Sequence, residues 1–109
     1  MGSLNGQNNH SSLPAAHDCL LERITALLSR WHGLQMAVQN QWGGHDSFQK
    51  SQQLAADIFS WFIHSKAPQI EDLKNLLHER MLLSLNTEIE DGSIEEVNTH
   101  ILSMLHENL

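Results

Sequence analysis

The stretch that decides the fold runs from Trp31 to Gly44 and reads WHGLQMAVQNQWGG. Its large apolar residues recur every three or four positions, which places them on one side of an α-helix. Gly43 and Gly44 lack a Cβ atom and can adopt the left-handed conformation that ends a helix. We therefore expect a helix that ends at this glycine pair and lets the next helix fold back. Its predicted buried stripe consists of Trp31, Leu34, Val38 and Trp42.

The same periodicity extends upstream of Trp31, to about Ala15. It is interrupted only by Gly33, and a glycine inside a helix costs about 1 kcal/mol relative to alanine. We predict either two helices in near continuity or one long helix that bends near Gly33. The upstream members of the stripe are Leu20, Ile24, Leu27 and Leu28.

Three further helical patterns follow the glycine pair. The first has Asp46 as its predicted N-cap, with Gln49 three residues later. Pro68 is expected to end this helix and to be the first residue of the next one. Ser93 and Glu96 form a predicted capping box for the last helix. The apolar stripes are Phe48, Leu54, Ala55, Ile58, Phe59, Trp61, Phe62 and Ile63; then Ile70, Leu73, Leu76, Leu77, Met81 and Leu85; then Val97, Ile101, Met104 and Leu105.

These patterns predict an all-α fold. No segment alternates with a period of two, as a strand would. A chain of 109 residues has room for one hydrophobic core. Residues 1–14 are rich in Asn, Ser and Gly and are expected to be a disordered tail, which leaves residues 15–109 as one domain of about five helices. The pattern leaves open whether Trp61 lies in the core or is an exposed anchor.

The charges are divided unevenly along the chain. The formal net charge is −7, and no Lys or Arg follows Arg80, whereas six acidic residues do. Phosphate binding requires clustered basic residues, so we expect no direct contact with nucleic acid. An acidic region attracts a basic partner; the alternative is a solvated loop followed by a helix N-terminus that the helix dipole favours. The predicted partner-binding residues are Glu88, Glu90, Asp91, Glu95 and Glu96.

The sequence offers little support for catalysis or for a cofactor. The eight histidines never stand three or four residues apart, as helical metal ligands do. The lone cysteine, Cys19, stands beside two leucines, where burial is favoured over nucleophilic chemistry. The paired carboxylates fall in a polar loop, whereas acid–base catalysis needs partly buried groups. We therefore expect no enzyme activity, metal or cofactor, and no apolar run is long enough for a membrane helix.

Two motifs resemble the signature of the WGG-motif pre-rRNA-processing family. The first is Trp31-x-x-Leu-Gln-x-Ala-Val-Gln-Asn-x-Trp-Gly-Gly, followed by Asp46-Ser47 and Lys50. The second is Glu88-x-Glu90-Asp91-Gly92-Ser93, which is similar to an acidic segment before the family's last helix. The resemblance extends over residues 18–106. The sequence departs from the family at Gln39, where Glu is common, and at Gln52 and Gln53, where charged or aromatic residues are frequent.

The resemblance implies an escort, or escortin, for a ribosomal protein. Members of the family take the eukaryotic twenty-sixth small-subunit ribosomal protein, which is basic and contains zinc, from its import receptor. They shield it until it joins the nascent subunit, which supports small-subunit pre-rRNA processing. The resemblance thus implies a chaperone of the nucleus and cytoplasm that handles neither RNA nor zinc directly, and we expect it to be monomeric alone. The alternative is a helical adaptor or dimerisation module without a ribosomal client.

Overall fold

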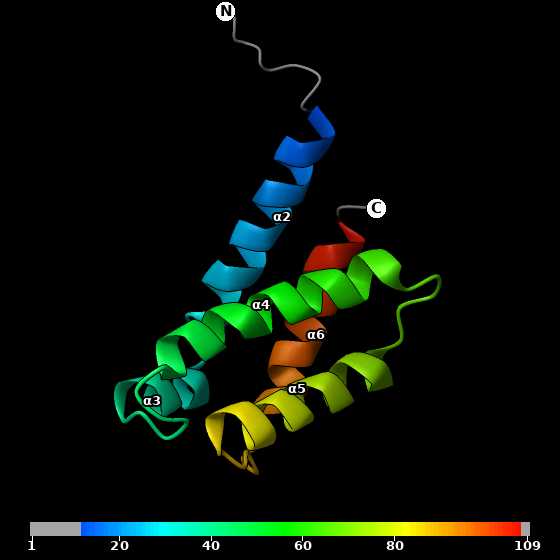
Figure 1. Cartoon of the computed structure of the whole chain (residues 1–109). Helices are drawn as coiled ribbons and strands as arrows, with labels where there is room; N and C mark the ends of the chain where they lie inside the picture. The colour runs from blue at the N-terminus through cyan, green and yellow to red at the C-terminus, as the bar shows by residue number, and fades with distance from the viewer. Residues whose placement is uncertain (1–11, 108–109) are drawn as a thin grey trace, which may run out of the picture.

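The computed structural model describes residues 12–107, with side chains from Cys19 onward, and this part of the chain forms five α-helices and no strand (Figure 1). The all-α prediction is therefore confirmed. Of the predicted tail, residues 1–11 lie outside the described residues, whereas residues 12–14 are helical. None of the described helices is long and apolar enough to cross a membrane. The helices are α2 (Ser12–Leu28), α3 (His32–Gln39), α4 (Ser47–His64), α5 (Ile70–Leu85) and α6 (Ser93–His106).

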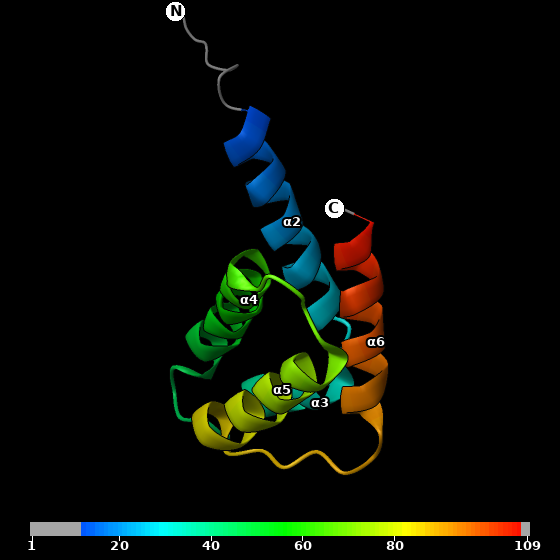
Figure 2. The same cartoon turned by 90° about the vertical axis from the view of Figure 1, so that its right-hand side faces the viewer.

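The helices pack around one core. Helix α2 packs against α4 and α6, and α5 packs against the same two helices. The short helix α3 fills the corner between α4 and α5. The N-terminal half of α2 projects beyond its neighbours (Figure 1). Figure 2 shows the connection between α5 and α6 running beneath α5 to the start of α6.

Each helix buries one apolar stripe. Ile24, Ile58 and Ile101, from α2, α4 and α6, have no exposed surface. Complete burial of such a side chain contributes about 1.5–3 kcal/mol to the free energy of unfolding. Trp61 lies partly buried at the edge of the core. The other buried apolar residues are Leu20, Leu28, Trp31, Leu34, Ala37, Leu54, Ala55, Phe62, Leu73, Leu77, Met81, Leu85, Ile94, Val97, Leu102, Met104 and Leu105.

Besides Trp42, four residues that the sequence places in the core or in buried surroundings are exposed. Phe48 and Ile63, in the first and last turns of α4, and Ile70, the first residue of α5, each expose at least 45% of their surface. Helix ends have fewer neighbours, and periodicity takes no account of this. Cys19 is also exposed although its neighbour Leu20 is buried, because the two side chains lie on different faces of α2.

The long upstream pattern folds as two helices, but the break precedes Gly33. Helix α2 ends at Leu28, and Trp31 has an extended backbone (φ −82°, ψ 108°) just before α3. The Trp31 side chain is buried, with 4% of its surface exposed. Gly33 lies inside the first turn of α3. The glycine therefore does not bend the helix, and its role lies in tertiary packing.

The expected glycine stop of α3 is wrong, because the helix ends earlier. Gln41 adopts the left-handed conformation (φ 55°) immediately after the last helical turn. Its N–H donates to the carbonyl of Val38, and the N–H of Trp42 donates to the carbonyl of Ala37. This pair of bonds is the Schellman motif. Trp42 follows the turn and exposes 45% of its surface, so its predicted place in the core is also wrong.

Two more predicted helix boundaries are wrong. Helix α4 ends at His64, and Pro68 lies in the connection that follows. Gln69 has an extended backbone (φ −110°, ψ 143°), so α5 begins only at Ile70. Asp46 does stand at the N-cap position of α4, but its side chain caps no backbone N–H and instead pairs with Lys50.

Candidate functional site, an acidic loop packed against the Trp-Gly-Gly turn

The five acidic residues selected from the sequence lie on one continuous segment, the α5–α6 loop and the first turn of α6. All five are exposed. Among the described side chains, only Glu95 of this set forms a salt bridge, with Lys74 at 3.1 Å. The structure therefore brings the acidic residues together and leaves most of their charge without a cationic partner. Their role in binding a partner stays a prediction.

Three of the other five Lys and Arg residues form salt bridges with carboxylates outside the acidic set. Arg23 pairs with Glu107 at 3.3 Å, and Lys50 pairs with Asp46 at 3.4 Å. Arg80 contacts Asp57 at 2.8 Å on α4, which directs its guanidinium away from the loop. Within the described part of the chain, Lys74 is thus the one Lys or Arg that pairs with the acidic set.

The start of the acidic loop is fixed by backbone and hydroxyl hydrogen bonds. Asn86 takes the left-handed conformation (φ 51°, ψ 39°) at the end of α5, which asparagine tolerates better than most residues. The next residue, Thr87, is buried, and its N–H donates to the carbonyl of Met81 at 2.9 Å. Its hydroxyl donates to the carbonyl of Leu85 at 2.7 Å. Thr87 was not among the residues predicted from the sequence; the Asn-Thr pair after an apolar stripe is the signal that marks it.

The end of the acidic loop is fixed by Trp31. The indole N–H, at Nε1, donates to the hydroxyl of Ser93 at 2.9 Å. The Ser93 N–H donates in turn to the carboxylate of Asp91 at 3.0 Å. Gly92, with φ 83°, takes the N-cap position of α6. The predicted capping box is therefore wrong: the Ser93 hydroxyl accepts the indole proton and caps no backbone N–H.

Gly33 and Gly43, near the two ends of the stretch from Trp31 to Gly44, both lie close to the α5–α6 region. A Cβ atom on Gly33 would lie 2.9 Å from the side-chain Cδ1 atom of Ile89, in the middle of the loop. A Cβ atom on Gly43 would lie 2.6 Å from the carbonyl oxygen of Ser84 and 2.9 Å from Cα of Leu85. The motif therefore contacts the end of α5, the middle of the loop and, through its tryptophan, the start of α6.

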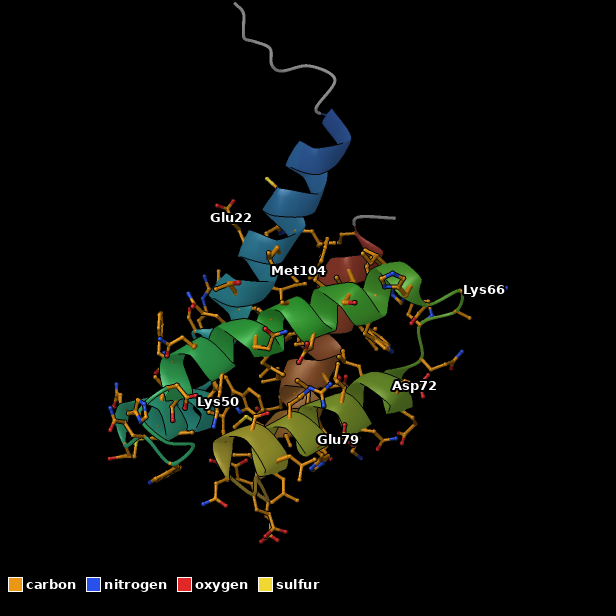
Figure 3. All side chains as sticks on the ribbon, in the orientation of Figure 1. Glu22, Lys50, Lys66, Asp72, Glu79 and Met104 are labelled. Atoms are coloured by element: carbon orange, nitrogen blue, oxygen red, sulfur yellow. The ribbon has the colours of Figure 1, made fainter. Side chains whose placement is uncertain are left out.

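The turn that carries Gly43 is held by two polar side chains of α4. Ser47 is almost fully buried; its hydroxyl accepts the N–H of Gly43 at 3.0 Å and donates to the carbonyl of Gly44 at 2.6 Å. The Nζ of Lys50 donates to the carbonyl of Gly43 at 2.6 Å (Figure 3). These contacts explain the Asp-Ser and Lys positions of the first motif: Ser47 and Lys50 fix the turn, and Asp46 pairs with Lys50.

Hydrogen bonds favour the ionised form of two carboxyls in the acidic set. The Ser93 hydroxyl and N–H lower the pKa of Asp91, and His32 adds a small effect of the same sign. The pKa of Glu95 is lowered by its own backbone N–H, in the first turn of α6, and then by Lys74. Both groups therefore stay negatively charged at a lower pH than ordinary carboxylates do.

The described side chains contain no group of three or more His, Cys, Asp or Glu that could hold a metal ion. The grouping that stands out is instead the acidic loop with its contacts to the turn. The fold and this site define a small all-helical domain in which a Trp-Gly-Gly turn holds an acidic loop in place.

Residues 20–99 match the sequence model of the WGG family, described as pre-rRNA-processing protein TSR2. The chain belongs to this family, as its two motifs indicated. It is 32% identical over 83 residues to a TSR2 homolog of Mus musculus, an alignment that covers 76% of this chain and 44% of the relative. It is 23% identical over 84 residues to TSR2 of Saccharomyces cerevisiae, with 77% and 41% covered. The chain therefore spans less than half the length of these relatives, and no solved structure matches it.

Proposed function

We propose that this domain is an escort that binds a basic small-subunit ribosomal protein through its acidic loop and thereby supports small-subunit pre-rRNA processing. The names of its relatives, pre-rRNA-processing protein TSR2 homologs, support the processing role. The observation that carries the binding role is the acidic loop itself. It presents exposed carboxylates with little cationic compensation, and it is fixed at its start, middle and end.

A fixed loop suits this task for an energetic reason. Binding orders mobile loops and side chains, and that cost lowers affinity unless the site is ordered beforehand. The contacts of Trp31 and Thr87 order the loop in the free protein. The carboxylates themselves stay in water, so they attract a basic client over a distance of about 10 Å at 0.1 M salt. Such a surface captures its client fast and releases it when a stronger competitor, such as a nascent subunit, offers phosphates.

The proposed client is the twenty-sixth small-subunit ribosomal protein of eukaryotes, taken from its import receptor and delivered to pre-ribosomes. The escort is a one-to-one binder, monomeric alone, that works in the nucleus and cytoplasm. An acidic surface competes with the receptor for the basic residues of the client, and it repels rRNA. The domain thus shields the client without handling RNA itself.

A pair of charge reversals tests the acidic loop. Glu88 and Glu90 are exposed, and neither forms a salt bridge with another described side chain. Glu88→Lys with Glu90→Lys therefore changes charge without removing internal support. The matched control is Glu71→Lys with Asp72→Lys, an equal charge change at the exposed start of α5. Figure 3 shows Asp72 at the far end of that helix from the loop.

Affinity for the recombinant ribosomal protein is measured by calorimetry at several salt concentrations. We expect the loop variant to bind about tenfold or more weakly and with a smaller salt dependence, and the control to bind within about threefold of the original. If both variants are folded by circular dichroism and lose affinity equally, only net charge matters, and the acidic loop is not the binding site. Sedimentation over a concentration series tests the monomer; self-association without client binding would favour the adaptor alternative.

A further inference from the structure

Helix α5 exposes two adjacent leucines directly beside the acidic loop. Leu82 exposes 51% of its surface and Leu83 exposes 71%. They do not belong to the buried stripe of α5, which repeats every four residues and is complete without them. Neither leucine is therefore needed to close the core. The residues of that buried stripe are Leu73, Leu77, Met81 and Leu85.

The two leucines line a groove of about 410 Å³ between the outer face of α5 and the loop. Its α5 side includes His78 and Glu79, and its loop side includes Glu88 and Ile89. Carboxylates thus stand on both sides of an apolar floor, and no Lys or Arg lines the groove. Glu79 is paired with Arg80 at 3.0 Å, whereas Glu88 forms no salt bridge with another described side chain. Figure 3 shows Glu79 on the face of α5 turned away from α4.

A second groove on the domain gives a useful contrast. It lies where α2, α3 and α4 meet, and Phe48, with 59% of its surface exposed, is its most prominent apolar side chain. All of its polar lining residues are uncharged Ser, Thr or Gln. The two grooves therefore differ in charge, and of these two the groove lined by Leu82 and Leu83 is the one that is electrostatically complementary to a basic segment.

We propose that the groove formed by Leu82, Leu83 and Ile89, the leucine groove, binds a large apolar side chain that Lys or Arg residues flank in the client. The apolar side chain lies on the leucines, and the flanking cations contact Glu88 and the carboxylate of Glu79, which is shared with Arg80. This inference rests on the proposed function and deepens it: the client is held by an apolar anchor as well as by charge. Charge alone binds any polycation, whereas an anchor requires a particular residue at a particular position.

The anchor makes a distinct prediction about salt. Ion pairs between exposed groups weaken as salt screens them, but burial of apolar surface does not. A client bound in both ways retains part of its affinity at high salt. Removal of the leucines lowers affinity at every salt concentration by a similar factor, whereas reversal of loop charges changes the salt dependence.

The test variant is Leu82→Gln with Leu83→Gln, because glutamine keeps helix propensity and removes the apolar surface. The control is Phe48→Gln with Ile63→Gln, which removes two other exposed apolar side chains, far from the acidic loop in sequence. Leu82→Met with Leu83→Met keeps the surface apolar and is expected to bind like the original. Circular dichroism checks that each variant is folded, and Leu83→Ala serves as a milder second variant.

We expect the glutamine pair to weaken binding of the recombinant ribosomal protein about tenfold with an unchanged salt slope, and the control to bind within about twofold. Unchanged affinity of both the glutamine pair and Leu83→Ala would contradict binding in the leucine groove. The acidic site is tested separately, by Glu88→Lys with Glu90→Lys. A designed peptide makes the test independent of that client: a lysine-rich peptide with one central leucine should bind more tightly than its glutamine counterpart. Equal binding of the two peptides would also overturn the groove.

Discussion

Trp31 and Ser93 stand 62 positions apart in the sequence, and the indole N–H of Trp31 donates a hydrogen bond to the Ser93 hydroxyl at 2.9 Å. Trp31 lies buried where α2 meets α3, and Ser93 is the first residue of α6. A buried indole N–H needs an acceptor, since an unpaired one loses its hydrogen bond to water. This bond therefore joins the two motifs that identify the family, the Trp-Gly-Gly stretch and the acidic loop.

Trp31→Phe and Ser93→Ala should each destabilise the fold, because each removes one partner of this bond. A net loss of about 1 kcal/mol in the free energy of unfolding is expected for the bond, and the phenylalanine variant adds the loss of packed volume. Urea denaturation of both single variants and of the double variant measures the coupling. We expect the loss of stability in the double variant to be about 0.5–1.5 kcal/mol smaller than the sum of the two single losses. Strictly additive losses would contradict a direct bond; Ser103→Ala, at an exposed position of α6, is the control.

The lowered pKa of Asp91 predicts how stability responds to acid. The carboxyl titrates at its ordinary value of 3.8 when the chain is unfolded and below that value when it is folded. Its contribution to stability is therefore complete above pH 3.8 and is lost as the pH falls through the lower, folded pKa. Ser93→Ala removes the hydroxyl donor and should raise the folded pKa towards 3.8.

Carboxyl titration by NMR checks this prediction. Glu95 is the internal control, because its lowered pKa depends on its own backbone N–H and on Lys74 rather than on Ser93. Lys74→Gln should raise the pKa of Glu95 and leave that of Asp91 in place. If Ser93→Ala moved both carboxyls equally, a general change in the loop would explain the shift better than one hydrogen bond.

The two glycines that touch the α5–α6 region should respond differently to alanine. At Gly43 the new Cβ meets backbone atoms of Ser84 and Leu85, which cannot move without shifting the end of α5. Overpacking of this kind costs about 1–3 kcal/mol. At Gly33 the obstacle is the tip of the flexible Ile89 side chain, and alanine gains about 1 kcal/mol of helix propensity.

Urea denaturation should therefore find Gly43→Ala clearly less stable than the original and Gly33→Ala near neutral. Client binding is expected to weaken in Gly43→Ala through the displaced turn, and in Gly33→Ala through a displaced Ile89. If Gly43→Ala kept its stability but no longer bound the client, Gly43 would belong to the contact surface and not to the packing of the turn.

Periodicity predicted the helices well because every helix buries one apolar stripe, and the spacing of apolar residues in the local sequence defines that stripe. Four residues on the predicted stripes have no exposed surface: Ile24, Ile58, Leu77 and Ile101. The acidic set was also found from local sequence, because exposed charges on one segment need no tertiary information. Three of the five residues lie in the α5–α6 loop and two in the first turn of α6, and their role in binding a partner stays a prediction.

The helix ends were predicted less well because tertiary contacts decide them. Ser93 has the sequence of a cap, yet Trp31 competes for its hydroxyl from a distant part of the chain. Asn98 is a further example: it stands on α6 among apolar residues, is 1% exposed, and donates through Nδ2 to the carbonyl of Ile70 at 2.9 Å. No spacing rule marks a buried asparagine whose partner lies 28 residues away.

The two tryptophans of the motif provide the last prediction. Trp31 is buried and hydrogen-bonded, whereas Trp42 follows the Schellman turn and exposes 45% of its surface. Trp31→Ala should therefore cost about 3–5 kcal/mol, as truncation of a buried aromatic residue does. Trp42→Gln should cost about 1 kcal/mol or less, because substitutions at exposed positions rarely do more.

Urea denaturation of the two variants gives the comparison, and acrylamide quenching of the original protein gives an independent one. Acrylamide should quench a fluorescence component that Trp42→Gln removes, and it should not reach Trp31. If Trp42→Gln unfolded the domain as severely as Trp31→Ala, both tryptophans would be packing residues. The expected near-neutral result would leave Trp42 as a surface residue of the motif, available to a partner beside Gly43 and the end of α5.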